Sequence, residues 1–548
     1  MATTGRKMDA IWGEFEKIAA NKAKCRSCGY ECAPLVDRLK KHYYKVHQLS
    51  GTTNEESSLQ STPGPSTAKQ PRISDFAVKT TPEQKARFDK EVGRFFFANN
   101  VAFRAVESRH FTALVHSLHP GYQPPSRKQL GNEILNSVYE DQQASAKKQL
   151  AGKLVTMCID GWTDNANEPI VCFSVQANSK VYLVETIDTG AESHTGEYLA
   201  ELTQNAIASA EDKYECVIVA ITTDNAENMV KMKKLVAENL DSVITVGCVA
   251  HQLNLLAKDL SPKELVSRIS AISKAFKYSH VLRGLLASKD GATMAVIPSD
   301  VRWSSTVTMF KWYQRNWNHL REVANDNQEN FRTGKNKEVR KYIVDLALYK
   351  QVEDAVNVLT PISLAIDLVQ GNQVTLADAV HAWKKVLESY RSLEGEGREW
   401  LAAAETRYNK SVTAVFFVAH SLHPKYLGNN LTTSEWNEAT NWVRENRASC
   451  MSEYLQFIGG TKDVIQQVYA ISANCELGNF YKSQEILGNL EKELVELAVT
   501  LISIAPSSAG LERVFSSMGF VHSDLRNRLA PEKVGKLAFC LRVLNEKF

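Results

Sequence analysis

The sequence predicts a multidomain protein of mixed α/β and all-α regions, in which a large helical insertion interrupts an α/β core. Three observations lead to this prediction. A chain of 548 residues is too long for one hydrophobic core and should hold about three domains. Apolar strands alternate with helical segments between residues 148 and 262. More than two hundred residues of helical periodicity follow, as expected for an inserted helical domain.

The composition is that of a soluble globular protein, with 44% hydrophobic and 23% charged residues. No apolar run approaches the roughly 18 residues that a membrane helix needs, so we expect no membrane partner. The first residues lack the apolar core of a signal peptide, and ten cysteines are too few for a disulfide scaffold, which favours a reducing compartment. The net charge is only +3, but residues 1–50 carry ten Lys and Arg against five Asp and Glu, which favours an acidic partner for this segment.

Residues 1–48 contain the spacing of a metal site. Two residues separate Cys25 from Cys28, and thirteen residues then precede His42, which is followed by His47. Two thiolates on a tight turn and two imidazoles near the end of a short helix are enough to close a tetrahedral Zn²⁺ site. The alternative is that the four residues are unrelated.

A short helix is expected after Pro34, which is well placed to start it. Its predicted inner face consists of Leu35, Leu39 and Val46. Its basic residues, which can meet DNA phosphates, are Arg38, Lys40, Lys41 and Lys45. With Trp12 and Phe15 before the cysteines, the segment resembles a BED-type zinc finger, a DNA-binding module, although zinc fingers also bind proteins. Cys32 is expected to be an ordinary small residue.

Residues 49–82 are rich in Ser, Thr, Pro and Gly, which predicts a flexible linker. Residues 83–147 return to helical periodicity and predict a helical segment for DNA binding or dimerisation. A second helix in this segment is expected at 106–118, and residues 119–127 break the pattern. The expected core positions of the first helix are Phe88, Val92, Phe95 and Phe96.

Residues 148–262 predict the first part of the α/β core. The expected strands are 153–159, 170–177, 181–187, 216–223 and 243–248. The expected helices are 195–210 and 226–240. The first three strands follow one another closely and should form an antiparallel meander, whereas the later strands should run parallel and be covered on both faces. This order is that of an RNase H-like core with a mixed five-stranded sheet.

Residues 263–486 predict the helical insertion, and residues 487–548 the return to the core. The tail contains three apolar stripes at helical spacing. They consist of Leu490, Leu494, Leu497, Ala498 and Leu501; of Leu511, Val514, Phe515 and Met518; and of Val534, Leu537, Ala538, Leu541 and Leu544.

Two predicted strands each end on an aspartate, Asp160 and Asp224. Since neighbouring strands lie about 4.8 Å apart, carboxylates at adjoining ends can share the two hard cations that serve phosphodiester chemistry. A third acid is expected, and Glu512 lies beside the apolar stripe of its helix, where it is either a ligand or a helix-end partner. The other nearby acids are expected at turns or strand ends, namely Asp164, Asp188 and Asp300.

The chain resembles the hAT superfamily of DNA transposases over nearly its whole length. The most specific match is residues 506–529, PSSAGLERVFSSMGFVHSDLRNRL, which are similar to the family's C-terminal signature. The other matching motifs are Asp160-Gly-Trp-Thr, Thr223-Asp-Asn-Ala-x-Asn-Met229, Cys248-Val-Ala-His251 and Arg302-Trp-Ser304. By this resemblance, Asp160, Asp224 and Glu512 would be the catalytic triad that holds Mg²⁺ or Mn²⁺.

The resemblance also implies four DNA-contacting residues, namely Cys248, His251, Arg302 and Trp303. Arg302 would neutralise phosphate, and Trp303 would stack on an unpaired base, which is worth roughly 1–3 kcal/mol. Without the resemblance, His251 is equally well explained as a structural residue, and Trp303 as a core aromatic.

The implied function is a cut-and-paste transposase of the nucleus. It would bind the terminal inverted repeats of an element, cleave double-stranded DNA by hydrolysis and transesterification with hairpins on the flanking ends, and join the element to target DNA. At least a homodimer is implied, because two ends are cut in one assembly. The main alternative is a domesticated, transposase-derived DNA-binding regulator without cleavage activity. A cellular RNase H-like nuclease is disfavoured by the finger, the insertion and the C-terminal signature.

Overall fold

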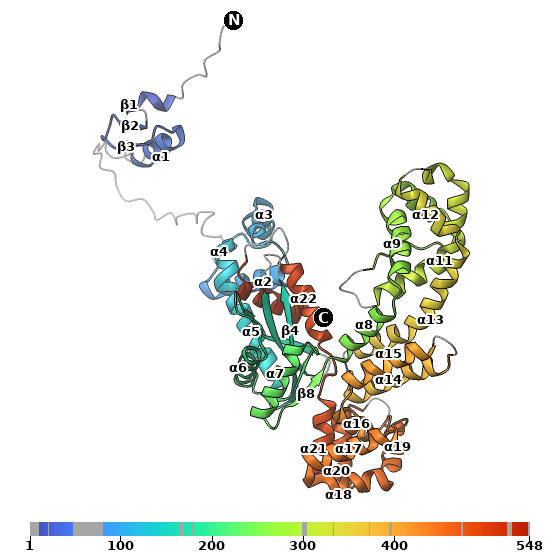
Figure 1. Ribbon diagram of the computed structural model, residues 1–548. Helices are drawn as coiled ribbons and strands as arrows, with labels where there is room; N and C mark the ends of the chain where they lie inside the picture. The colour runs from blue at the N-terminus through green and yellow to red at the C-terminus, as the bar shows by residue number, and fades with distance from the viewer. Residues whose placement is uncertain are drawn as a thin grey trace, which may run out of the picture. The chain divides into compact units, whose positions relative to one another are not determined.

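A computed structural model describes most of the chain, in two compact units that divide after Ala77 and are treated separately here (Figure 1). The described residues are 10–19, 21–47, 80–163, 169–177, 180–298, 304–332, 334–371, 373–393, 397–472, 475–522 and 529–545. Within these ranges, no helix is both long and apolar enough to cross a lipid bilayer.

The first unit is a small antiparallel sheet with one helix beside it. Its elements are η1 (Ala10–Gly13), β1 (Phe15–Ala19), β2 (Lys22–Cys25), β3 (Glu31–Cys32) and α1 (Val36–Val46). Its buried core is very small and consists of Ile11, Phe15, Ala23, Cys25 and Leu39. A core of this size contributes little hydrophobic stabilisation by itself.

The predicted inner face of α1 is correct only for Leu39. Leu35 is 57% exposed and Val46 is 46% exposed. Leu35 precedes the helix in an extended conformation, so its four-residue spacing from Leu39 is not a helical spacing. Val36 and Tyr43 pack on the core instead, three and four residues from Leu39.

The second unit begins with helices whose buried side chains belong to the same core as those of the sheet. They are α2 (Pro82–Ala98), η3 (Phe103–Glu107), α3 (Arg109–Leu118), α4 (Arg127–Gln129), η4 (Leu130–Ile134) and α5 (Leu135–Leu150). Phe96 and Phe97 are buried, but Phe95 is 56% exposed, so its prediction as a core residue is wrong. The helix predicted at 106–118 is divided at Ser108, whose hydroxyl caps α3.

The five-stranded mixed sheet confirms the predicted strand order and directions. Its strands are β4 (Leu154–Thr163), β5 (Pro169–Ala177), β6 (Lys180–Asp188), β7 (Val217–Thr223) and β8 (Ile244–Gly247), and the helices between them are α6 (Gly196–Tyr214) and α7 (Glu227–Asn239). The spatial order is β6-β5-β4-β7-β8. The first three strands pair antiparallel, and β4-β7-β8 run parallel. All residues of β7 after Val217 are buried, so both of its faces are covered.

The described residues between 252 and 486 form helices and no strand, as predicted. The elements from β8 to the return of the chain are α8 (Val249–Leu260), α9 (Lys263–Tyr278), α10 (His280–Ala287), α11 (Ser305–Asp326), η5 (Gln328–Phe331), α12 (Lys335–Val344), α13 (Leu346–Val369), α14 (Leu376–Arg391), α15 (Gly397–Ser411), α16 (Ala414–Leu422), α17 (Thr433–Asn446), η6 (Ala448–Cys450), α18 (Met451–Gln456), η7 (Phe457–Thr461), α19 (Lys462–Ile471), α20 (Leu477–Ile486) and α21 (Lys492–Ile502).

The chain passes from one hydrophobic core to another near residue 505. The buried residues of the tail from Leu490 to Ile504 belong to the core of the helical region, and those from Leu511 onwards belong to the core around the sheet. The last helices are α22 (Ala509–Val521), which lies beside β4 (Figure 1), and α23 (Pro531–Asn545). A Cβ atom on Gly510 would come within 2.5 Å of the Val181 side chain, so this glycine allows α22 to start against β6.

Candidate functional site

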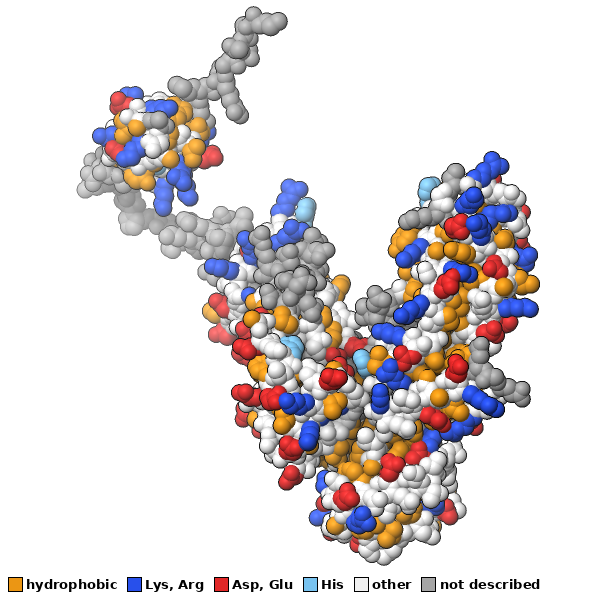
Figure 2. All heavy atoms as spheres, in the orientation of Figure 1, with side chains coloured by type: hydrophobic (Ala, Val, Ile, Leu, Met, Phe, Trp, Pro, Cys, Tyr) orange, Lys and Arg blue, Asp and Glu red, His pale blue; other side chains and the backbone are white. Residues whose placement is uncertain are grey.

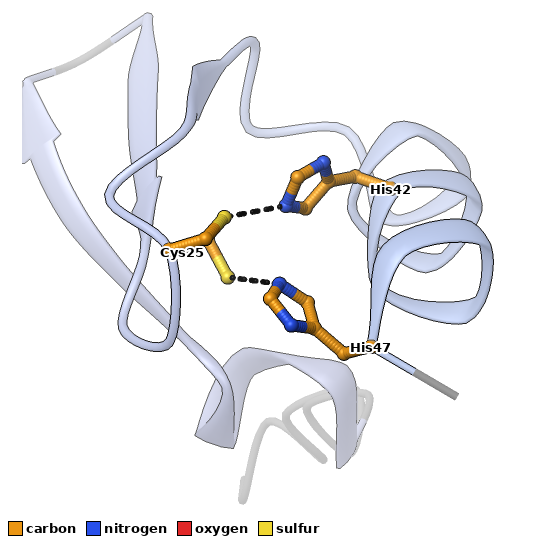
Figure 3. Close-up of side chains that lie close together, drawn as sticks. Cys25, His42 and His47 are labelled. Carbon is orange, nitrogen blue, oxygen red and sulfur yellow. Dashed lines mark hydrogen bonds between the residues drawn. The ribbon is translucent and has the colours of Figure 1, made fainter. Parts of the chain in front are cut away.

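The first unit brings the four predicted zinc ligands together. Cys28 Sγ lies 3.2 Å from His42 Nε2, and Cys25 Sγ lies 3.5 Å from His47 Nε2. Figure 3 shows both imidazole rings directed from the helical side toward the cysteine side. All four ligand atoms lie within 4.8 Å of one another. Tetrahedral Zn²⁺ with ordinary bond lengths needs sulfur and nitrogen about 3.6 Å apart, so this donor set fits the ion.

Local chemistry explains the position of these ligands. The turn after β2 requires a positive φ of 75° at Gly29, whose N–H donates to the carbonyl oxygen of Cys25. The Tyr30 ring stacks on the His42 ring at a centroid distance of 4.4 Å. Burial, and then the neighbouring His47, lower the pKa of His42, which favours the neutral imidazole that binds metal.

The helix that carries the histidines also carries the predicted basic residues. Arg38, Lys41 and Lys45 are exposed, and Lys40 is half-buried. Figure 2 shows Lys and Arg side chains over the visible face of this unit, with fewer acidic ones. The helix therefore presents cationic groups to solvent, as a phosphate-contacting helix requires.

In the second unit, the strand register places Asp160 and Asp224 at the same level. Cys158 on β4 pairs with Thr222 on the parallel strand β7. Asp160 lies two residues further along β4, and Asp224 lies two residues beyond Thr222, directly after the end of β7. Side chains two residues apart along a strand point to the same face. The register therefore places Asp160 and Asp224 at the same level of neighbouring strands. The prediction that Asp160 ends its strand is wrong, because β4 continues to Thr163 and Gly161 pairs with Val171 of β5.

The segment that returns from the helical region crosses the same face of the sheet. We call residues Ser503–Ser508 the return segment. The hydroxyl of Thr156 on β4 donates to the carbonyl oxygen of Ser503 and accepts from the amide of Ala505, both at 2.9 Å. The hydroxyl of Thr222 on β7 donates to the carbonyl oxygen of Ala505 at 2.6 Å. Two strands thus hold the return segment by its backbone.

The start of α8 holds the other end of the return segment. The amide of Val249 donates to the carbonyl oxygen of Pro506 at 2.9 Å, and the amide of Ser508 lies 3.4 Å from Cys248 Sγ. Cys248 is 1% exposed. Its thiol therefore contacts the protein and is covered from solvent, which gives this predicted DNA-contacting residue a structural role.

The return segment delivers Glu512 in the first turn of α22. Phe515, one turn further on, stacks on Trp162, which lies two residues after Asp160 on the same face of β4. Burial, and then the charge of Asp224, raise the pKa of Asp160 to about 7. Burial, and then the charge of Asp160, raise the pKa of Glu512 to about 8. The fold thus brings all three predicted carboxylates into one electrostatic group.

This carboxylate cluster, Asp160, Asp224 and Glu512, is looser than the zinc-ligand group. Among the described residues, only the ligands of the first unit gather three or more donor atoms within 4.8 Å. Carboxylate oxygens are the donors that Mg²⁺ and Mn²⁺ prefer, and mutual repulsion between partly buried carboxylates is relieved by a cation. The donor set therefore fits a divalent cation.

Other polar groups surround Asp224. His251 lies in the first turn of α8, and burial lowers its pKa, against the opposing effect of Asp224. Lys233 on α7 donates to the side-chain oxygen of Asn225 at 2.6 Å. Burial lowers the pKa of Lys233 to about 8, although Asp224 opposes this shift. The sequence did not single out Lys233, because a lysine on an amphipathic helix is normally a solvated residue.

Of the predicted acids and DNA-contacting residues not yet placed, only Asp188 lies within the described part of the chain. Arg302, Trp303, Asp164 and Asp300 lie outside the described residues. Asp188 ends β6 and accepts a hydrogen bond from the amide of Gly190, which agrees with its predicted role at a strand end.

Part of the chain is similar to known proteins. Residues 125–276 match a domain of unknown function, DUF659, which is found in hAT-like transposase-related proteins. The match contains Asp160 and Asp224 but ends before Glu512. Over this stretch, the chain is similar to transposase-related proteins.

A second similarity is to a longer protein. A relative from Talaromyces stipitatus named "Putative transcriptional regulator tpeD" is 24% identical over 282 residues. The alignment covers 47% of this chain and 32% of the relative, so the chain spans about a third of the length of the curated relative it matches.

Proposed function

We propose that the protein is a DNA transposase of the hAT type, with an RNase H-like core interrupted by the helical region. One observation carries the proposal. Asp160, Asp224 and Glu512 come from β4, from the residue after β7 and from α22, and more than 350 positions separate the first from the last. Nevertheless, besides burial, the charge of Asp224 raises the pKa of Asp160, and the charge of Asp160 raises the pKa of Glu512. A fold that accepts this repulsion is typical of a cation-binding active site.

The carboxylate cluster would hold divalent cations, which when bound activate the attacking oxygen and stabilise the leaving oxygen of a phosphodiester. The protein's own contribution is to position the acids. The hydroxyls of Thr156 and Thr222 hold the return segment, and the stack of Trp162 on Phe515 holds α22 against β4. The reactions would be hydrolysis at the element ends, transesterification to flanking hairpins, and joining to target DNA.

The first unit would be a BED-type finger that holds Zn²⁺ through Cys25, Cys28, His42 and His47 and contacts duplex DNA through α1. Its task would be to find the terminal inverted repeats. We place this activity in the nucleus, and expect at least a homodimer assembled through the tail around α23, since two element ends must be cut together.

A DNA-binding regulator without cleavage is the second candidate. The name of the Talaromyces relative favours it, and the domain match is compatible with both functions. The two candidates share the finger and the fold, so DNA binding does not separate them. The two candidates differ only in whether the carboxylate cluster cleaves DNA.

Cleavage tests the proposal directly. Purified protein is incubated with Mg²⁺ or Mn²⁺ and with duplex DNA taken from the flanks of its coding sequence, beside Asp224→Ala and Asp188→Ala variants. We expect nicks and hairpins with the unaltered protein and with Asp188→Ala, and none with Asp224→Ala. If the unaltered protein binds the DNA but leaves it intact, the regulator is the better description.

A further inference from the structure

A cavity of about 690 Å³ opens next to the carboxylate cluster. One wall comes from the sheet side, with Asp224 and Asn225 after β7 and Lys233 on α7. The other wall comes from the end of α15 in the helical region, with Arg407 and Lys410. The cavity extends beyond the acid motifs to residues that no motif includes, such as Lys233 and Lys410.

Asn225 joins the two walls. Its side-chain oxygen accepts a hydrogen bond from Lys233 Nζ at 2.6 Å, and its side-chain nitrogen donates to the carbonyl oxygen of Lys410 at 3.3 Å. Gly247 makes room for this contact, because a Cβ atom there would come within 2.5 Å of the Asn225 amide. The cavity is therefore a built feature, in which Asn225 holds the ammonium group of Lys233 and the backbone of Lys410.

The charge of the lining is predominantly positive. The lining contains four cationic residues, Lys233, Lys234, Arg407 and Lys410, and one acid, Asp224. Lys234 is exposed and lies 3.9 Å from Glu238 on the same helix. Arg407 is anchored by Asp259 at 2.7 Å. Lys410 is exposed, and its ammonium group forms no hydrogen bond or ion pair with the residues that the structure describes. Such a lining attracts an anion.

The size of the cavity limits what that anion can be. The major groove of a DNA duplex alone is about 12 Å wide, so the whole duplex is too large for a pocket of a few hundred cubic ångströms. A single strand does fit, because a basic groove can follow its backbone one phosphate at a time. The cavity also begins at Asp224, where the proposed reaction requires a phosphodiester.

We propose that this cavity binds the sugar–phosphate backbone of one DNA strand beside the carboxylate cluster, with Lys410 and Lys233 contacting a phosphate next to the reacting one. The proposal rests on DNA being the substrate of the carboxylate cluster. It gives the helical region a direct part in the site, because Lys410 and Arg407 bind substrate from α15. It also assigns Asn225 a positioning role between the two walls.

The test measures strand binding without cleavage. The full-length protein is titrated with a fluorescent single-stranded oligonucleotide in EDTA at several salt concentrations, beside Lys410→Ala and the matched variant Lys482→Ala, which removes an exposed lysine from α20. We expect Lys410→Ala to weaken binding similarly for all sequences and to lower the slope of log affinity against log salt by about 0.7, the value for one contact on a single strand. Lys482→Ala should leave the slope unchanged.

Three further measurements make the outcome decisive. Crosslinking of an iodouracil-containing strand should label peptides of residues 225–255 or 407–413. In a separate competition measurement, inorganic phosphate should displace the oligonucleotide no more than sulfate does at the same ionic strength. An unchanged slope for Lys410→Ala, or crosslinks confined to other peptides, would overturn the proposal. Competition by phosphate alone would mean a site for free phosphate. If binding behaves as expected but no DNA is cut with Mg²⁺ or Mn²⁺, the cavity proposal stands and the transposase proposal fails.

Discussion

The zinc-ligand group and the carboxylate cluster are built in opposite ways. The four ligands of the finger come from residues 25–47 and rest on a core of five buried side chains. The three acids come from residues as far apart as Asp160 and Glu512 and rest between two large cores. We therefore expect the first site to need an ion in order to fold, whereas the second site forms only when distant parts of the chain have folded together.

The difference also appears in the electrostatics. In the first unit, each cysteine sulfur lies within 3.5 Å of a histidine nitrogen, and burial, followed by the neighbouring His47, lowers the pKa of His42. In the carboxylate cluster, burial and like charge raise the pKa of both Asp160 and Glu512, so the fold holds these acids at a cost in stability. Four predictions test this contrast, and they follow in order of expected effect.

Removal of zinc should unfold the finger alone. Structural Zn²⁺ contributes about 10–16 kcal/mol in zinc-finger peptides, far more than so small a core supplies. We expect Cys28→Ser to lose zinc, measured as metal content, and to make the first unit sensitive to protease. The melting temperature of the second unit should not change. Cys32→Ser is the matched control, because Cys32 lies outside the ligand group and should leave zinc bound.

Glu512→Gln should abolish cleavage while the protein stays folded. The substitution keeps the size of the side chain but removes the negative charge that would hold a cation, and loss of a catalytic group costs about 10³-fold or more. Strand cleavage per hour and DNA affinity are measured together. Glu496→Gln, which changes an exposed glutamate on α21, should cleave normally. Equal cleavage by Glu512→Gln would remove this residue from the triad.

The same contrast explains how far the sequence alone predicts the molecule. Spacing identifies the zinc ligands because they are local, and apolar runs identify the strands that carry Asp160 and precede Asp224, although β4 continues beyond Asp160. Periodicity does not distinguish Glu512 from other helical acids, and only the resemblance selects it. Lys410 and Asn225 are not recognisable as neighbours, because one lies in the helical region and their contact depends on tertiary packing. Leu35, Val46 and Phe95 show that spacing alone does not decide which face is buried.

Asp160→Asn should stabilise the protein in EDTA above neutral pH. The pKa of Asp160 is raised from 3.8 to about 7 in the folded state, so the folded protein holds a proton that the unfolded chain releases. Stability should therefore fall as the pH rises from about 4 to about 7 and then level off. The variant escapes this loss and should gain about 2–4 kcal/mol at pH 8, and nearly nothing at pH 4, in urea unfolding.

The control for this effect is Asp212→Asn, which neutralises an exposed acid on α6. Its unfolding free energy should track that of the unaltered protein across the pH range. The quantity compared is the unfolding free energy of Asp160→Asn minus that of the unaltered protein. If this difference is smaller at pH 8 than at pH 4, the pKa of Asp160 is not raised.

The smallest effect is expected from Thr222→Val, which keeps the shape of the side chain but removes the hydroxyl that donates to Ala505. The buried carbonyl oxygen then loses a hydrogen bond, which costs about 1–3 kcal/mol. Because the return segment leads directly into α22, we also expect Glu512 to be misplaced and cleavage to fall about tenfold, since small displacements of a catalytic group are costly. Thr222→Ser retains the hydroxyl and should recover most of the cleavage. If Thr222→Val loses stability but cleaves normally, the return segment supports the fold without positioning the third acid.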